Sequence, residues 1–345
     1  MKVLAITNMY PTSAFPAHGT FVRSQVESLR PLVDVEVLHI DRAALGRGAY
    51  FKVPAAVGRA VSAVNPDLIH VMNGGALALF SASAARHLPF VVSFCGSDLL
   101  GDPQRSWKRR ASGRATVWAS KVAALRADAI IAKSKQLAAK LPNIVSAKKI
   151  HIIPNGVDFD RFRPLDRAEC RRRLGWREDE FQVLFTGNPA SETKRFHDAS
   201  AAVECIRARG VAAQLQLMRG VQHEEVPLWL NAADVLLLCS LHEGSPNIIK
   251  ESLACECPVV ATDVGDVAER IEAIDGCWLC QRSTQSLADG LQAVQRRGAR
   301  IQSRDKIASL GLAAIAQRVV GVYREVAKNP RGQGRNQLSI ERRPA

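Results

Sequence analysis

The sequence predicts an α/β protein built from two doubly wound parallel sheets. Short apolar runs alternate with longer segments of helical period through almost the whole chain. A polar, Arg-rich stretch at residues 162–180 interrupts this alternation once, and the alternation then restarts. The 345 residues suffice for two domains at roughly 150 residues each. A strand, a helix and a further strand in repeated order are typical of a parallel sheet.

Six apolar runs in the first half of the chain are expected to be strands. They are Lys2 to Asn8, Val33 to His39, Asp67 to Val71, Pro89 to Phe94, Asp128 to Ala132 and Lys149 to Ile153. Segments of helical period, such as Thr20 to Leu32 and Gly75 to His87, lie between them. We therefore expect a first Rossmann-like domain over residues 1–165.

Five further runs predict a second Rossmann-like domain over residues 166–309. They are Phe181 to Thr186, Gln214 to Arg219, Asp234 to Cys239, Pro258 to Ala261 and Gly276 to Cys280. Residues 310–328 carry one more helical pattern and are expected to pack back on the first domain. Residues 329–345 are polar and rich in Arg, which is typical of a disordered tail. Two such sheets in tandem leave a cleft at the carboxyl ends of their strands.

The chain is strongly basic, with a formal net charge of +14 and a pI near 9.8. Nucleic acid, an anionic membrane surface and a phosphate-bearing substrate each explain such an excess. The N-terminal apolar run is too short for a signal peptide, and no run reaches the roughly 18 apolar residues of a spanning helix. We expect a cytoplasmic protein, with peripheral binding to the inner face of the plasma membrane left open.

The segment from Arg105 to Arg110 begins the most basic part of the chain, and Arg114, Trp118, Lys121 and Arg126 follow it. Cations mixed with tryptophan suit an anionic membrane surface. An ordinary basic helix that covers a core with its alkyl stems explains them equally well. Nucleic-acid binding is not expected, because no recognised motif accompanies the charge.

The sequence gives little support for a metal site. Cys277-Trp-Leu-Cys280 is one CxxC pair without a second, so core packing is the better interpretation. Asp158-Phe-Asp160 lies in a Pro-Asn-Gly-Val-Asp stretch, where turn chemistry explains both aspartates. No Walker A loop is present, which argues against a nucleotide hydrolase. We expect neither a metal nor another cofactor.

The stretch from His242 to Cys255 follows a predicted strand and opens a predicted helix. Ser245 is expected to be the N-cap and Pro246 the first helical residue. The unpaired amides of the first turn then belong to Asn247 and Ile248, where a phosphate is favoured.

Two glutamates flank this turn. Glu243 lies just before the helix and Glu251 about one turn inside it. Carboxylates accept hydrogen bonds from vicinal hydroxyls, so two of them around a phosphate site suit a nucleotide sugar. The alternative is that Glu243 only favours the helix dipole and Glu251 is solvated surface.

Residues 243–251, continuing to Gly265, resemble the E-x7-E signature of the family 4 retaining glycosyltransferases, which have the GT-B fold. Further similar stretches in the family's order are Ser93 to Asp98, Ala129 to Ser134, Ile152 to Pro164 and Asn231 to Asp234. The resemblance covers roughly residues 1–325.

The resemblance implies roles for several of these residues. Glu243 would face the hydroxyls of the donor sugar, and Glu251 would hold the ribose. The amides from Ser245 to Ile248 would meet the sugar and the diphosphate. Gly19, just before a predicted helix, matches the family's glycine loop near the donor phosphate.

The family's basic pair is only partly present. It consists of an Arg just after a strand-ending Gly and a Lys a few residues later, and it neutralises the diphosphate leaving group. Here Gly187 is followed by Asn188 in place of the Arg, while Lys194 fits the Lys. Arg195 is the candidate for the second positive charge.

A second departure lies in the motif that ends at Asp98. Many family members carry a His near the donor sugar at the position that Cys95 occupies here. A thiol is a weak substitute for imidazole as a hydrogen-bonding group. His18 and His70 are polar groups on predicted strand ends, and a structural or neutral role is the better interpretation of both.

The resemblance implies a retaining, metal-independent glycosyltransferase. It would move a sugar from a nucleotide-diphosphate donor to a hydroxyl of a sugar or lipid-linked acceptor, in polysaccharide, lipopolysaccharide or other glycoconjugate synthesis. A GT-B-fold nucleotide-sugar epimerase is one alternative. A catalytically impaired sugar-nucleotide-binding protein, suggested by Asn188 and Cys95, is another.

Overall fold

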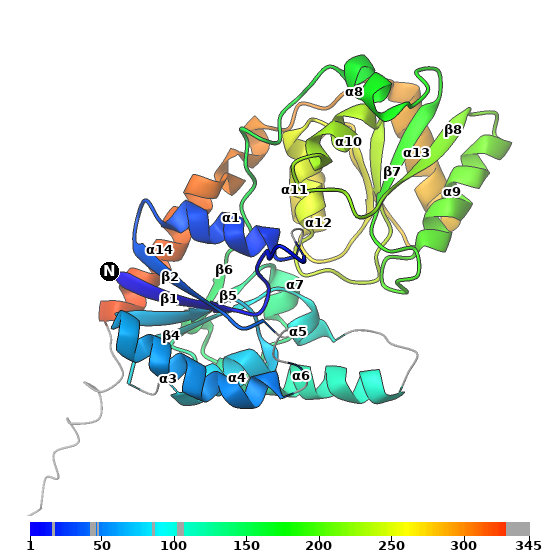
Figure 1. The fold of residues 1–345 in the computed structure, drawn as a ribbon. Helices are drawn as coiled ribbons and strands as arrows, with labels where there is room; N and C mark the ends of the chain where they lie inside the picture. The colour runs from blue at the N-terminus through cyan, green and yellow to red at the C-terminus, as the bar shows by residue number, and fades with distance from the viewer. Residues whose placement is uncertain (16–17, 42–45, 47, 85–86, 102–106, 329–345) are drawn as a thin grey trace, which may run out of the picture.

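The computed structural model describes residues 1–15, 18–41, 46, 48–84, 87–101 and 107–328. Two parallel sheets form two lobes joined by the green and orange segments of the chain (Figure 1). The first sheet has six strands in the order β2-β1-β3-β4-β5-β6, and the second has five in the order β11-β10-β9-β7-β8. The predicted fold class is confirmed, because both sheets are doubly wound.

All six strands predicted for the first domain form. They are β1 (Lys2–Thr7), β2 (Asp34–His39), β3 (Leu68–Val71), β4 (Phe90–Phe94), β5 (Ala129–Ala132) and β6 (Ile150–Ile152). The helices are α1 (Thr20–Leu29), η1 (Ala49–Lys52), α3 (Val53–Val64), α4 (Gly75–Ala84), α5 (Ser97–Leu100), α6 (Trp107–Arg126), α7 (Lys135–Ala138) and η2 (Ala147–Lys149). Every residue of β3, β4 and β5 is buried. Strands covered on both faces by helices appear in a sequence as continuous apolar runs, which is why they were predictable.

The five strands predicted for the second domain also form. They are β7 (Phe181–Thr186), β8 (Ala213–Met218), β9 (Val235–Leu238), β10 (Val259–Thr262) and β11 (Trp278–Cys280). The helices are α8 (Arg167–Leu174), α9 (Phe196–Ala208), α10 (Val226–Ala232), α11 (Asn247–Ala254), α12 (Val267–Ile271), α13 (Thr284–Arg297) and η3 (Asp305–Leu310). The polar stretch that separates the two halves contains α8. Its buried Arg171 pairs with Asp234 at 2.6 Å.

The last described helix, α14 (Leu312–Lys328), returns to the first domain and packs on α1 (Figure 1). The hydroxyl of its buried Tyr323 lies 2.6 Å from Nδ1 of His70, and Nε2 of His70 lies 2.7 Å from Oγ of Ser93. Burial lowers the pKa of His70 to about 3, so this imidazole is neutral. The structural role expected for His70 is confirmed. Residues 329–345, the predicted tail, lie outside the described residues.

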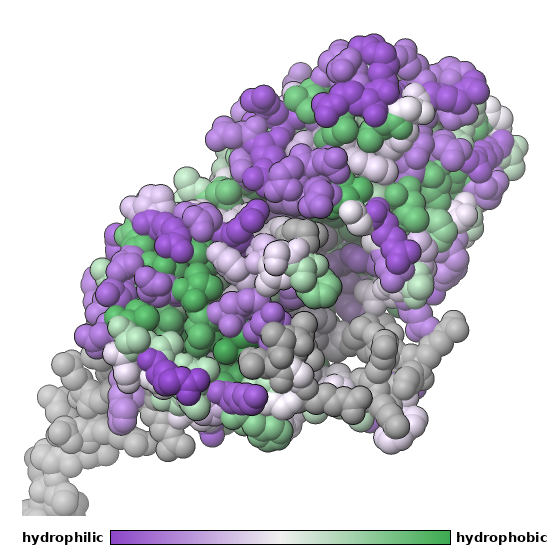
Figure 2. All heavy atoms as spheres, viewed as in Figure 1, coloured by the Kyte–Doolittle hydropathy of each residue, from purple (hydrophilic) through white to green (hydrophobic). Residues whose placement is uncertain are grey.

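Hydrophilic side chains cover most of the second domain on the face shown in Figure 2, while apolar and polar residues intermix on the first. Among the described helices, none is both long enough and apolar enough to cross a membrane. The predicted basic segment is only partly described, because residues 102–106 lie outside the described residues and α6 begins at Trp107.

Candidate active site

A cavity of about 360 Å³ lies at the carboxyl ends of the strands of the second sheet. The residues after β7 and β8 form one part of its wall, and α11 forms another. Those used below are Gly187, Asn188, Arg219, Gly220, Ile248 and Glu251. This is the edge at which open parallel sheets bind their ligands.

Glu251 lies one turn inside α11 and is held from outside the cavity. Its side chain is only 14% exposed, and its Oε1 lies 3.3 Å from Nε2 of His223. Nη1 of Arg161 lies 2.9 Å from Nδ1 of the same imidazole. Because a guanidinium can only donate, Nδ1 accepts, and the proton of a neutral His223 is on Nε2, where it is donated to Glu251. Glu251 is therefore an oriented acceptor, and the solvated-surface alternative for it is wrong.

The start of α11 differs from its prediction by one residue. The helix begins at Asn247, and Pro246 occupies the N-cap without a side-chain hydrogen bond, so the assignment of Ser245 as N-cap is wrong. Oγ of Ser245 instead donates to Asp266 and accepts from the buried ammonium of Lys250, each at 2.9 Å. A buried lysine needs polar partners, and this requirement outweighs the usual preference of serine for a helix N-cap.

Glu243 and Lys194 form an ion pair, with Nζ and Oε1 2.6 Å apart. Oγ of Ser240 donates to the same oxygen at 2.8 Å. Lys194 reaches this position by passing over Gly187, where an added Cβ would lie 3.1 Å from Cγ of Lys194. Gly187 also has a φ of +124°, which favours glycine. Three predicted site residues thus come together beside the cavity.

Arg195 does not join them. It is the N-cap of α9, and its guanidinium donates to both carboxylate oxygens of Asp198, at 2.7 and 3.0 Å. Its charge is balanced there, and it does not line the cavity. Asn188 does line the cavity, and its Oδ1 accepts from the backbone N–H of Ala190 at 3.1 Å.

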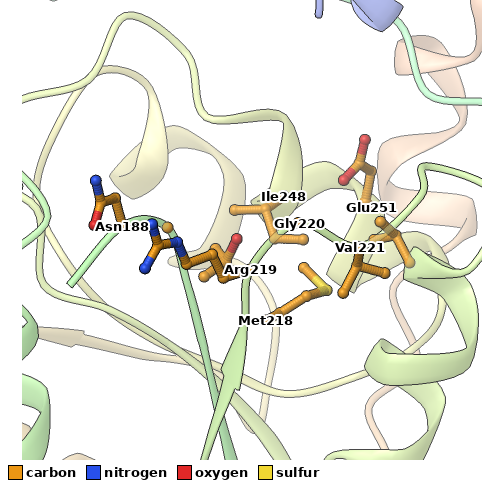
Figure 3. Close-up of a pocket in the computed structure, with 10 residues that line it drawn as sticks. Asn188, Met218, Arg219, Gly220, Val221, Ile248 and Glu251 are labelled. Carbon is orange, nitrogen blue, oxygen red and sulfur yellow. The ribbon is translucent and has the colours of Figure 1, made fainter. Parts of the chain in front are cut away.

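Arg219 is a cation of this cavity that the sequence analysis missed. Figure 3 shows Arg219 and Asn188 together at one end of the cavity and Glu251 at the other. Among the described residues Arg219 has no hydrogen-bond or ion-pair partner, and its side chain is exposed. Thr186 and Met218 pair across β7 and β8, so Arg219 follows its strand beside the position where Gly187 follows the other. The sequence feature that could have identified Arg219 is its position as a basic residue at the end of a predicted strand.

On the first domain, Gly19 forms the N-cap of α1 with a φ of +72°. A Cβ at this position would lie 2.3 Å from the carbonyl carbon of Met9, so only glycine fits. The adjacent His18 lines a separate cavity of about 770 Å³. Asn8, Tyr10, Asp41 and Asn73 also face that cavity.

Asp98 acts on the loop that carries Cys95. The residue is 4% exposed, and its carboxylate accepts from the backbone N–H groups of Gly74, Cys95 and Gly96, at 3.0, 3.0 and 2.8 Å. It is a positioning residue whose oxygens are occupied by backbone. Burial raises the pKa of the Cys95 thiol to about 12, so Cys95 offers a neutral thiol rather than a nucleophile.

The stretch Asp158-Phe-Asp160 forms a turn, as predicted. Oδ1 of Asp158 accepts from the backbone N–H groups of Asp160 and Arg161, each at 3.1 Å. Cys277 and Cys280 are free thiols. Within the described ranges no group of three or more His, Cys, Asp or Glu side chains is placed to hold a metal ion.

Comparisons with known proteins agree with this geometry. The family model described as Glycosyltransferase Family 4 matches residues 14–161, and the one described as Glycosyl transferases group 1 matches residues 168–296. Together the two matches span most of both domains.

Curated relatives are similar over most of their length. The Bacillus subtilis protein TuaC, named as a teichuronic acid biosynthesis glycosyltransferase, is 28% identical over 84% of this chain and 88% of its own. An alpha-maltose-1-phosphate synthase of Mycobacterium tuberculosis is 24% identical over 78% of this chain and 81% of its own.

Solved structures show the GT-B fold. Sucrose-phosphate synthase from Thermosynechococcus elongatus superposes with a TM-score of 0.77 at 18% identity, covering 94% of this chain and 99% of that one. The UDP-GlcNAc 2-epimerase of Methanocaldococcus jannaschii superposes less well, with a TM-score of 0.59 at 12% identity over 94% of this chain and 100% of that one. At these identities the likeness concerns the fold alone.

Proposed function

Because this chain is a family 4-type glycosyltransferase, we propose that it transfers a sugar from a nucleotide-diphosphate donor to an acceptor hydroxyl, with retention of configuration and without a metal. One observation carries the proposal. A single cavity has an oriented carboxylate, Glu251, at one end and the cation Arg219 at the other, and it adjoins the Lys194–Glu243 pair.

This arrangement fits the parts of a nucleotide sugar in order. Glu251 accepts from the ribose hydroxyls, since its own orientation is fixed by His223. Arg219 and Lys194 neutralise the diphosphate, and the backbone near Ile248 at the start of α11 adds N–H donors. Glu243, 2.6 Å from Lys194, accepts from the hydroxyls of the donor sugar.

The proposed chemistry needs two cations and no metal. The bond between the anomeric carbon and the diphosphate oxygen breaks, and the acceptor oxygen bonds to the same face of that carbon. The acceptor proton passes to the departing diphosphate. Positive charge next to the leaving group stabilises the transition state. We assign this role to Lys194 and Arg219 rather than to Arg195, because Asp198 already balances the charge of Arg195.

We place the acceptor among growing glycans or lipid-linked sugars. The relative named for teichuronic acid biosynthesis supports this class of acceptor. The exposed Trp107 at the start of the basic helix α6 supports peripheral binding at the cytoplasmic face of a membrane.

The proposal is tested by incubating the protein with UDP-, GDP- and ADP-sugars, with and without a glycan acceptor. We expect one donor to release nucleoside diphosphate only when acceptor is present, and the product to keep the anomeric configuration of the donor by NMR. EDTA should leave the rate unchanged. Donor consumption without acceptor would indicate an epimerase, and absence of turnover with donor binding retained would indicate an impaired binding protein. An inverted anomer would overturn the retaining mechanism.

A further inference from the structure

A further cavity, of about 820 Å³ and lined by basic residues, lies where the two domains meet. Arg110, Arg114, Trp118 and Lys121 of α6 form its wall on the first domain, and Leu241 and His242 form part of it on the second. We call it the α6 cavity. Its size is in the range of small-molecule sites, which run from about 300 to 1,000 Å³.

The three cations of the α6 cavity and its tryptophan form one row along the helix. Successive members are separated by four, four and three positions, which places all of them on one face: Arg110, Arg114, Trp118 and Lys121. Residues 107–126 contain no Asp or Glu. Among the described residues Arg114 and Lys121 form no ion pair. Arg114 and Lys121 therefore present uncompensated positive charge to the cavity.

The wall on the second domain, which contains Leu241 and His242, lies next to the proposed reaction centre. His242 directly precedes Glu243, so a ligand in the α6 cavity lies beside the residue that we assign to the donor sugar. Glu243 does not neutralise the row, because its carboxylate is already paired with Lys194 at 2.6 Å. The cavity is open to an anion and adjoins the place where an acceptor hydroxyl must arrive.

A basic helix on a flat surface would suit a membrane, but this row lines a cavity shared by both domains. We propose that the α6 cavity binds an acceptor that carries a phosphate or diphosphate group. Arg110, Arg114 and Lys121 hold that group, and Trp118, 62% exposed, contacts an apolar portion next to it. This inference rests on the proposed function, since it names the acceptor class of the same enzyme.

Direct binding tests the site without any transfer reaction. The probes are farnesyl diphosphate, inorganic pyrophosphate and farnesol, measured by calorimetry on the full chain. The variants are Arg114→Gln and Lys121→Gln, and Arg126→Gln is the matched control on the same helix, because it does not line the cavity. Removing one charged contact to a diphosphate weakens binding by roughly ten-fold or more.

We expect farnesyl diphosphate to bind more tightly than farnesol, and both cavity variants to weaken it about ten-fold while the control does not. Trp118→Ala should weaken the binding of farnesyl diphosphate but not that of pyrophosphate. This difference distinguishes a lipid-linked phosphate from free phosphate as the ligand of the cavity. Equal binding of farnesol, or equal effects of all three charge variants, would overturn the proposal. Loss of anionic-vesicle binding in all three variants with unchanged farnesyl diphosphate binding would assign α6 to a membrane surface instead.

The kinetic arm separates this inference from the proposed function. Acceptors with one sugar and either a diphosphate or a neutral alkyl group are compared at saturating donor. We expect the cavity variants to raise KM for the phosphorylated acceptor only, with the donor KM unchanged. No transfer to either acceptor by the wild type would count against the proposed function. Transfer at equal KM to both would count against the α6 cavity alone.

Discussion

A Cβ atom on Gly244 would lie 1.9 Å from the carbonyl oxygen of Cys95, so the loops of the two domains touch through backbone at this point. The Cα of Gly96 would lie 2.9 Å from the same Cβ. On the other side, a Cβ on Gly265 would lie 2.8 Å from the carbonyl oxygen of Gly244. Only glycine permits such approaches. The contact adjoins Glu243, the residue that we propose for the donor sugar, and it limits how closely the two loops can approach each other there.

Gly244→Ala should therefore cost activity more than stability. The added methyl group must push the Cys95 loop away by an ångström or more, and such a displacement near reacting groups can cost about 10²-fold in rate. We expect kcat/KM to fall by that order while the melting temperature changes little. Gly321→Ala on α14 is the control, because its Cβ would meet no atom. Wild-type kcat/KM in Gly244→Ala would show that the domains do not meet here during the reaction.

The sequence allowed the fold to be predicted, since each feature that defines it is local. The apolar run from Asp128 to Ala132 contains β5 (Ala129–Ala132), a strand buried on both faces, and the run alone indicates such a strand. The chemistry of Ser245 depends on Asp266, 21 positions away, so its local N-cap preference misled the prediction. Arg219 gained significance only through the β7–β8 pairing, and the Gly244–Cys95 contact joins separate domains. Pairings of this kind are tertiary and leave no local pattern.

The Lys194–Glu243 ion pair predicts that Glu243→Gln will change nucleoside diphosphate affinity and sugar transfer rate in opposite directions. Without donor, Glu243 neutralises Lys194, so a diphosphate has to compete with a carboxylate 2.6 Å from the ammonium. Glu243→Gln removes that competition. We expect nucleoside diphosphate to bind several-fold more tightly by calorimetry, while the transfer rate falls at least ten-fold.

Lys194→Met is the matched comparison for this prediction. It removes the cation itself, so both nucleoside diphosphate affinity and transfer rate should fall. If Glu243→Gln weakened nucleoside diphosphate binding as much as Lys194→Met does, Lys194 would not be the group for which carboxylate and diphosphate compete.

The buried His70 predicts a stability loss at acid pH. Burial lowers its pKa to about 3 from the ordinary histidine value of 6.5, so as the pH falls His70 is protonated in the unfolded chain before it is protonated in the folded protein. The contribution of the neutral His70 to the free energy of unfolding is therefore greatest above about pH 6.5. It falls as the pH decreases toward 3, with a slope of up to about 1.4 kcal/mol per pH unit. His70→Asn cannot be protonated, and urea unfolding should show a shallower acid loss in the variant. Parallel curves for the two proteins would contradict the neutral His70–Tyr323 pair.

The proposed role of Arg219 predicts that Asn188→Arg restores activity to an Arg219→Ala variant but not to an Arg195→Ala variant. Asn188 stands where the family has an Arg, and we propose that Arg219 supplies the missing positive charge. Arg219→Ala should then lower kcat/KM by about 10²-fold, as loss of one preorganised donor to a developing anion does. Asn188→Arg in that background returns a guanidinium to the same end of the cavity, where Figure 3 places both side chains. We expect the double variant to recover most of the loss.

Arg195→Ala serves as comparison, because it breaks the Asp198 ion pair without removing a cation from the cavity, and Asn188→Arg should not rescue it. Should Arg195→Ala lose activity as Arg219→Ala does and be rescued in the same way, the leaving group would be neutralised from Arg195 and the assignment of Arg219 would fail.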